Sequence, residues 1–294
     1  MSSGNEASLT LPDGRVVEYF DGGDPSGRPV FFQPGTPATR IMGRLWHPAA
    51  AAAGARLISV SRPGYGGSTA VAERPTLSAA GRDIAALATL LGLDEYAVVG
   101  SSGGGPFAVA TAAVDPRRVR ALGVVAGGGP WRELADPSTE PQERACLARL
   151  DEGDLVGARA GMREVVENVW QAGLRELDGD ARLEAWLGDD PLAADPAYRV
   201  IMADAMREVL DSTEGAVFDG LAQGGGWDID FPAVQAPALL WYGGADEVCP
   251  VAYGHWYAER IAGAQLAIFP DDDHLAVADS HRPEILAALL KAWH

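Results

Sequence analysis

Short apolar, β-branched segments alternate with segments of helical period along most of the chain. This alternation is typical of an α/β fold in which helices cover both faces of a mostly parallel sheet. An Asp13-Gly14 turn near the amino terminus indicates an antiparallel hairpin at the start of that sheet. The predicted strands are residues 15–20, 29–32, 56–60, 95–99, 120–125, 237–242 and 265–269. The predicted helices are residues 41–53, 77–91, 106–114, 251–261 and 283–293.

The strand signals stop between Gly129 and Pro232, where only helical patterns remain. Residues 131–230 hold 23 Asp and Glu against 9 Lys and Arg, so a net charge of −14 out of the chain's −18 lies in this segment. Either a helical insertion over the edge of the sheet or a solvated outer layer of helices would explain it. Large apolar side chains favour the insertion, because a solvated layer does not need them. They are Trp131, Trp170, Trp186, Trp227, Met162, Met202 and Met206.

Composition and charge narrow the classes of function. The 294 residues, 47% hydrophobic and 22% charged, contain no apolar stretch near the roughly 18 residues of a membrane helix. The amino terminus lacks a basic start followed by an apolar core, so we expect no signal peptide. Two cysteines, Cys146 and Cys249, give neither a disulfide framework nor metal-ligand spacing, which favours a cytoplasmic protein without a metal site. The net charge of −18 argues against nucleic acid and anionic membranes as partners.

The most informative segment joins the fourth predicted strand to the third predicted helix. Read outward from Ser102, it is Gly100-Ser101-Ser102-Gly103-Gly104, the G-x-S-x-G pattern of a nucleophile elbow. A serine on a sharp strand-to-helix turn needs residues nearly without side chains two before and two after it. With Ser101 as the nucleophile, the position two before would be the branched Val99, so the spacing selects Ser102. An ordinary glycine turn is the alternative.

A serine nucleophile needs a histidine to take its proton and a carboxylate to orient that histidine. In this order of elements, the partners should follow the serine as Asp or Glu and then His. His274 fits, because it is expected in a loop between the last predicted strand and a helix; His281, near the next helix, is the runner-up. Asp246, in the loop after strand 237–242, is the predicted orienting carboxylate, and its neighbour Glu247 is expected to face solvent.

Catalysis of acyl transfer also needs hydrogen-bond donors where negative charge develops on the acyl oxygen. One predicted donor is the backbone N–H of Gly103, next to the nucleophile at a helix start. The other is the N–H of Thr36 in the loop Gln33-Pro34-Gly35-Thr36-Pro37, where Gly35 lets the backbone approach a substrate. A tight turn without chemistry is the alternative for this loop. Trp131, shortly after the last strand before the acidic segment, is expected to line the substrate pocket.

These motifs resemble those of α/β-hydrolase-fold serine hydrolases along nearly the whole chain. Besides the elbow and His274, residues 33–37 are similar to the family's oxyanion loop. Residues 61–68, Ser-Arg-Pro-Gly-Tyr-Gly-Gly-Ser, are similar to its D-x-P-G-x-G-x-S loop, and residues 243–250 to its Gly-x-x-Asp-x-x-x-Pro segment. The resemblance implies an eight-stranded, mostly parallel sheet with a helical lid after the sixth strand. The implied division is a core of residues 1–129 and 232–294 and a lid, or cap, of residues 130–231.

Three positions depart from the family's pattern. Pro34 stands where the oxyanion loop has a histidine, and Ser61 stands where an aspartate is common. Asp273 replaces the glycine that usually precedes the catalytic histidine, and we expect it to alter the geometry of that loop. The acidic run 271–273 is otherwise expected to be a solvated loop.

The leading hypothesis is hydrolysis of an ester, lactone or thioester of a small, apolar substrate through an acyl-enzyme, with no metal or cofactor. Lyases, cofactor-free haloperoxidases, C–C hydrolases and biosynthetic cyclases are alternatives on the same fold. An aminopeptidase whose acidic lid holds an α-amine, and a non-catalytic ligand-binding protein, are further alternatives. The complete set of Ser, Asp and His argues against a mere binder. We expect a small-molecule substrate, no nucleic-acid or membrane partner, and a monomer or homodimer.

Overall fold

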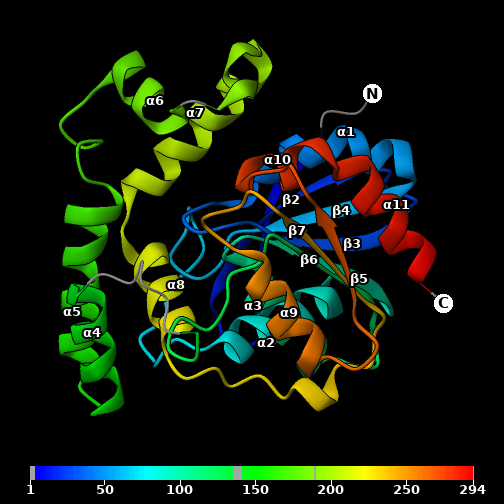
Figure 1. The fold of residues 1–294 in the computed structure, drawn as a ribbon, viewed down its shortest axis with the longest axis horizontal. Helices are drawn as coiled ribbons and strands as arrows, with labels where there is room; N and C mark the ends of the chain where they lie inside the picture. Colours follow the sequence, from blue (N-terminus) through cyan, green and yellow to red (C-terminus); the bar gives the residue numbers. More distant parts are fainter. Residues whose placement is uncertain (1–3, 135–140, 189, 294) are drawn as a thin grey trace.

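An eight-stranded sheet forms the centre of the computed structural model, which describes residues 4–134, 141–188 and 190–293 (Figure 1). Its strand order is β1-β2-β4-β3-β5-β6-β7-β8. β2 pairs antiparallel with both neighbours, and the other strands run parallel, which confirms the predicted α/β fold. The strands are β1 (Asn5–Thr10), β2 (Val16–Gly23), β3 (Arg28–Gln33), β4 (Ala55–Val60), β5 (Tyr96–Ser101), β6 (Val119–Val125), β7 (Ala238–Gly243) and β8 (Gln265–Phe269).

Helices cover both faces of this sheet (Figure 1). On one face α1 (Gly43–Ala53) packs against α11 (Arg282–Ala292). The other face carries α2 (Leu77–Leu90), α3 (Gly104–Val114) and α9 (Val251–Arg260). Because both faces are covered, the central strands are apolar along their whole length rather than alternating, as in β5, where Tyr96 to Val99 are all buried.

The predicted bounds differ from the observed ones mainly where glycine and proline blur the pattern. The predicted helix 41–53 divides into a 3-10 turn (Arg40–Met42) and α1. β5 extends two residues past the predicted strand, because Gly100 and Ser101 pair with β6. α3 begins at Gly104, two residues earlier than predicted. The turn at Ser102 is therefore tighter than the sequence pattern alone indicates.

The segment between β6 and β7 contains helices and no strand within its described residues, and lies beside the sheet (Figure 1). Its long side chains build two small apolar clusters, one among α4, α5 and α8 and one between α6 and α7. Met162 and Met206 are buried in these clusters, as an insertion with its own apolar contacts requires. The helices are α4 (Pro141–Asp151), α5 (Leu155–Val165), α6 (Gly179–Leu187), α7 (Pro196–Asp211) and α8 (Glu214–Gly224).

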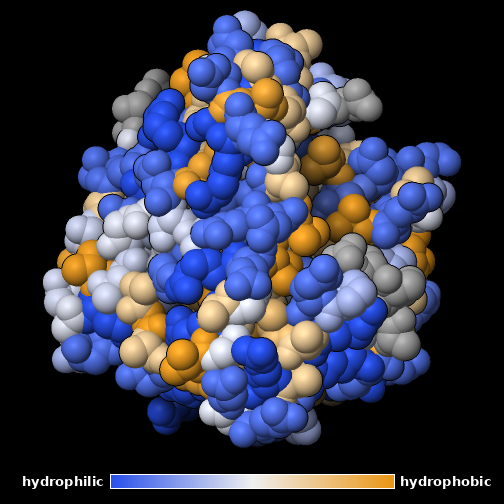
Figure 2. All heavy atoms as spheres, turned by 90° about the vertical axis from the view of Figure 1, so that its left-hand side faces the viewer, coloured by the Kyte–Doolittle hydropathy of each residue, from blue (hydrophilic) through white to orange (hydrophobic). Residues whose placement is uncertain are grey.

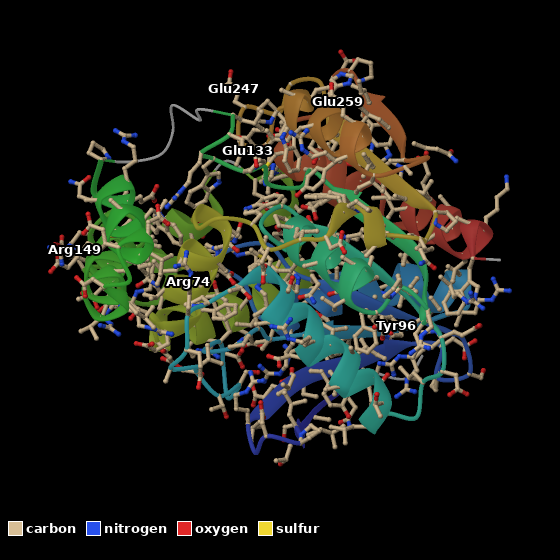
Figure 3. The ribbon with its side chains drawn as sticks, turned by 90° about the horizontal axis from the view of Figure 1, so that it is seen from below. Arg74, Tyr96, Glu133, Arg149, Glu247 and Glu259 are labelled. Atoms are coloured by element: carbon tan, nitrogen blue, oxygen red, sulfur yellow. The ribbon has the colours of Figure 1, made fainter. Side chains whose placement is uncertain are left out.

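The last helix of this segment, α8, ties it to the core. Phe218 of α8 stacks on Phe107 of α3 with ring centroids 6.2 Å apart. The outward face of the segment is mostly hydrophilic (Figure 2), and Arg149 of α4 points away from the molecule (Figure 3). The excess acid of this segment is thus largely compatible with a solvated outer face, while α8 directs its inner face toward the sheet.

The described residues show neither a membrane span nor a cluster of metal ligands. No helix there is long and apolar enough to span a bilayer. No group of three or more His, Cys, Asp or Glu side chains there is arranged to hold a metal ion.

Candidate active site

Ser102 lies at the sharp turn between β5 and α3. Its φ of 52° is in the left-handed region, which an ordinary residue adopts only where the surrounding structure imposes it. A Cβ at Gly100 would collide with the carbonyl oxygen of Gly104, and a Cβ at Gly104 would collide with the carbonyl oxygen of Gln33. The glycines two before and two after Ser102 are therefore a steric requirement of this turn.

The structure brings Ser102, His274 and Asp246 together in a hydrogen-bonded chain. Nε2 of His274 lies 2.9 Å from Oγ of Ser102, and Nδ1 lies 2.8 Å from Oδ2 of Asp246. The side chain of Asp246 is completely buried, and its Oδ1 accepts hydrogen bonds from the N–H groups of Val248 (2.8 Å) and Cys249 (2.7 Å). These bonds leave Oδ2 for the imidazole and fix the orientation of the ring.

The prediction of a loop at His274 is wrong, because this residue is the first of α10 (His274–Ser280). Asp273 is the reason: its carboxylate caps the helix by accepting hydrogen bonds from the N–H groups of Leu275 and Ala276. The departure from glycine at position 273 therefore starts a helix with the imidazole at its first turn.

The alternative acids and histidines lie elsewhere. Glu247 is exposed and points outward at the edge of the molecule (Figure 3). The acidic run is less solvated than expected, since Asp272 pairs with His281 at 2.7 Å. His47 accepts a hydrogen bond from the N–H of Gly23, 2.8 Å away, at the other end of the sheet.

The two predicted oxyanion donors face one cavity. Thr36 and Gly103 both line it, and among the described residues neither backbone N–H has a hydrogen-bond acceptor. Gly35 lies against Ser102: a Cβ there would be 3.3 Å from Cβ of Ser102. A side chain at position 35 would therefore press on the serine, which explains the glycine.

A buried arginine that the sequence analysis did not single out holds this loop. Arg62 donates from Nη1 to the carbonyl oxygen of Pro34 (2.6 Å) and from Nη2 to that of Gly35 (2.7 Å). In a trans peptide group the C=O and the N–H point in opposite directions. By binding the carbonyl of Gly35, Arg62 keeps the N–H of Thr36, a residue of the cavity wall, directed away from the guanidinium.

Arg62 is itself paired with a buried carboxylate on α8. Nε and Nη2 bind the two oxygens of Asp219 at 2.8 and 2.5 Å, and Asp219 is fully buried. Burial alone would lower the pKa of Arg62, but the Asp219 charge outweighs it and raises that pKa. Tyr65 donates to Oδ2 of Asp219 at 2.9 Å, and burial raises the pKa of this phenol well above its usual value. Arg62 therefore keeps its positive charge beneath the loop of residues 33–37.

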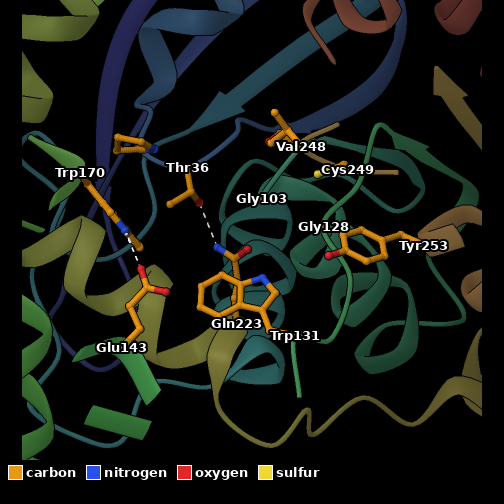
Figure 4. Close-up of a pocket in the computed structure, with 12 residues that line it drawn as sticks. Thr36, Gly103, Gly128, Trp131, Glu143, Trp170, Gln223, Val248, Cys249 and Tyr253 are labelled. Atoms are coloured by element: carbon orange, nitrogen blue, oxygen red, sulfur yellow. Dashed lines mark hydrogen bonds between the residues drawn. The ribbon is translucent and has the colours of Figure 1, made fainter. Parts of the chain in front are cut away.

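The cavity beside Ser102 has a volume of about 320 Å³, which suits a small ligand (Figure 4). Trp131 lines it, where the sequence analysis expected it. Further apolar walls come from the helical segment and from the loop and helix after β7. The polar side chains in the cavity wall include Gln223 and Glu143, and Glu143 accepts a hydrogen bond from Trp170 at 2.8 Å. The apolar lining residues that the sequence analysis missed are Pro37, Trp170, Val248 and Tyr253.

The sequence contains one local signal for two polar residues of the site that it does not identify, Asp219 and Gln223. Asp219 and Gln223 are four residues apart in a helical pattern, so they share one face of α8. That face meets the oxyanion loop only through the tertiary packing of α8, which the helical spacing does not reveal.

Residues 28–153 match the family model of the alpha/beta hydrolase fold, and the sheet order and the elbow geometry agree with it. The chain has the α/β-hydrolase fold. The chain is 28% identical over 271 residues to a non-heme haloperoxidase of Rhodococcus erythropolis, and the match covers 90% of this chain and 92% of that protein.

Two esterases are also similar to it. A pimeloyl-[acyl-carrier protein] methyl ester esterase of Chromobacterium violaceum is 28% identical over 205 residues, covering 65% of this chain and 67% of that protein. The solved structure of an esterase from Exiguobacterium antarcticum superposes with a TM-score of 0.69 at 21% identity, covering 97% of this chain and 98% of that one. This structural likeness shows the shared fold.

Proposed function

We propose that this α/β-hydrolase is a serine hydrolase that cleaves an ester, lactone or thioester of a small apolar substrate through an acyl-enzyme. The observation that carries the proposal is the position of His274 between two partners. Its Nε2 lies 2.9 Å from Oγ of Ser102 while its Nδ1 lies 2.8 Å from the buried carboxylate of Asp246. This geometry lets the imidazole take the serine proton and stabilises the imidazolium that results.

The proposed reaction has two halves. Oγ of Ser102 attacks the acyl carbon and its proton passes to Nε2 of His274, while the N–H groups of Gly103 and Thr36 bind the oxyanion. The leaving group departs with that proton and the acyl group stays on Ser102. Water then attacks the acyl-enzyme, giving one proton to His274, which returns it to Ser102 as the acid is released.

We propose that residues 130–231 form a lid over a core of residues 1–129 and 232–294. The separate apolar clusters within the helical segment support this division, as does the contribution of Trp131 and Trp170 to the cavity wall. Aromatic and aliphatic walls favour an apolar or aromatic acyl group. Two buried cysteines that form no disulfide fit a reducing compartment, so we propose a cytoplasmic enzyme, monomeric or homodimeric, acting on a small molecule.

A fluorophosphonate probe tests the proposal. We expect labelling of the wild-type protein at Ser102, and loss of labelling in Ser102→Ala and His274→Ala. Ser101→Ala is the matched control and should be labelled. Absence of labelling in the wild type would remove both the hydrolase and every other mechanism that starts from an activated Ser102.

A second candidate function is perhydrolysis followed by halide oxidation, because the haloperoxidase relative covers 90% of this chain. In this reaction hydrogen peroxide replaces water in attacking the acyl-enzyme and releases a peracid, which oxidises halide to hypohalite. Adding acetate, peroxide and bromide and following bromination of a dimedone reporter tests it. Bromination that disappears in Ser102→Ala, with no measurable ester hydrolysis, would favour this function over the first.

A further inference from the structure

The side-chain oxygen of Gln223, in the wall of the cavity, accepts no hydrogen bond from the part of the chain that the structure describes. Gln223 is 5% exposed and lines the cavity with Ser102 and Gly103. Its Nε2 donates to Oγ1 of Thr36 at 2.9 Å, whereas no described residue donates a hydrogen bond to its Oε1 (Figure 4). Oε1 lies on the Gly128 side, 3.6 Å from where a Cβ on that glycine would be. Gly128 also lines the cavity.

The orientation of this carboxamide follows from the charge beneath it. Asp219 forms a salt bridge with Arg62, and both of its carboxylate oxygens accept hydrogen bonds from that guanidinium. The hydroxyl of Thr36, 2.6 Å from Oδ2 of Asp219, must therefore donate its one hydrogen there. Oγ1 of Thr36 is left with lone pairs alone, so Gln223 has to offer it Nε2 and not Oε1.

The buried ion pair thereby sets the polarity of the cavity wall. If the oxygen and nitrogen of Gln223 were exchanged, Oε1 would face Oγ1 of Thr36 with no hydrogen between the two oxygens. This contact is unfavourable in a buried site. The cavity consequently meets a carbonyl oxygen, a hydrogen-bond acceptor, among mostly apolar walls. Burying that acceptor under a substrate that offers no donor would cost the desolvation free energy of the oxygen.

We propose that Gln223 selects substrates that carry an N–H or O–H donor in the acyl part, close to the scissile carbonyl, as N-acylamino and hydroxyacyl esters do. This inference rests on the proposed hydrolase function. The mechanism indicates which part of the substrate Gln223 faces. Because His274 must protonate the leaving group, the leaving group lies on the imidazole side of Ser102. Gln223 contacts Thr36 and adjoins Gly103, on the oxyanion side, and so faces the acyl part.

Two phenyl esters of the same shape test the proposal. Phenyl N-acetylglycinate carries an amide N–H where phenyl 4-oxopentanoate carries a methylene group, and the two acyl chains are otherwise identical. For the wild type we expect kcat/KM for the N-acetylglycinate to exceed that for the oxopentanoate by about five- to tenfold, the effect of one neutral hydrogen bond. Hydrolysis by Ser102→Ala gives the background for both esters.

Gln223→Met keeps the length of the side chain and removes the acceptor. We expect the ratio of the two kcat/KM values to fall about five- to tenfold below its wild-type value in this variant, because the loss of one hydrogen bond affects only the N-acetylglycinate. The ratio of the two kcat/KM values within one protein is insensitive to a general loss of activity. If Gln223→Met does not fold, the shorter Gln223→Asn replaces it and should also lose the preference.

The outcomes separate the two proposals. If the wild type hydrolyses both esters with equal kcat/KM, or if Gln223→Met retains the preference, Gln223 does not select a donor, while the hydrolase function stands. If the wild type hydrolyses neither these esters nor simple alkanoyl esters, the hydrolase function itself fails. A wild-type preference that falls about five- to tenfold in the variant that folds supports the assignment.

Discussion

At the scale of single residues, Arg62 carries two tasks: it neutralises Asp219 and orients the loop that holds Thr36. We expect Arg62→Met to lower the free energy of unfolding by about 3–5 kcal/mol, because it leaves a buried carboxylate without its counter-charge. We also expect kcat for a small ester to fall by up to about 10²-fold, because the N–H of Thr36 loses its fixed direction. Urea denaturation and steady-state kinetics measure the two effects.

The double variant Arg62→Met with Asp219→Leu separates these tasks. Replacing both charges should restore most of the lost stability, since no unpaired ion remains, yet kcat should stay low because the carbonyl of Gly35 still lacks its donor. Recovery of kcat together with stability would show that Arg62 acts only through the fold.

Single residues of the site differ in how far the sequence predicts them. Ser102 was predictable because its glycines stand at fixed local offsets, and Asp246 and His274 because each follows a strand in a known order. Arg62 and Asp219 are 157 positions apart, and no local pattern joins them. Their pairing depends on where α8 packs, which is a property of the tertiary structure.

At the scale of elements, the junction of β5 and α3 depends on two glycines without room for a methyl group. We expect Gly100→Ala to lower the free energy of unfolding by about 1–3 kcal/mol, because its Cβ would meet the backbone oxygen of Gly104, which cannot move without shifting α3. Gly226→Ala is the matched control, since a Cβ at that exposed position has no neighbour within 4 Å. Equal stability of the two variants in urea denaturation would contradict this steric account.

Elements were predicted well where the pattern is periodic and less well at their ends. The apolar runs located the central strands, because parallel strands covered on both faces need continuous apolar side chains. The start of α10 is not predicted. Asp273 caps this helix through the orientation of its side chain, and the sequence Asp271-Asp272-Asp273 does not distinguish such a cap from an ordinary acidic loop.

At the scale of the whole molecule, charge is distributed unevenly: residues 131–230 carry −14 of the net −18. The hydrophilic outer face of these helices keeps much of this charge in solvent (Figure 2). The same segment nevertheless lines the cavity with Trp131, Glu143, Trp170 and Gln223. The field of such a segment extends about 30 Å at 0.01 M salt and about 8 Å at 0.15 M. Small cations should therefore approach Ser102 faster than neutral molecules at low salt, whatever the substrate of the enzyme is.

Two phosphonates of similar size, one bearing a trimethylammonium group and one a neutral tert-butyl group, measure this effect through their rates of inactivation of Ser102. We expect the second-order rate constant of the cationic reagent to fall several-fold between about 10 mM and about 150 mM salt, and that of the neutral reagent to change little. Inactivation avoids any dependence on substrate preference, because both reagents react with the same oxygen. Equal salt dependence of the two rates would mean that the acidic helices act only as a solvated surface, and that solvent screens their charge before it reaches the entrance to the cavity.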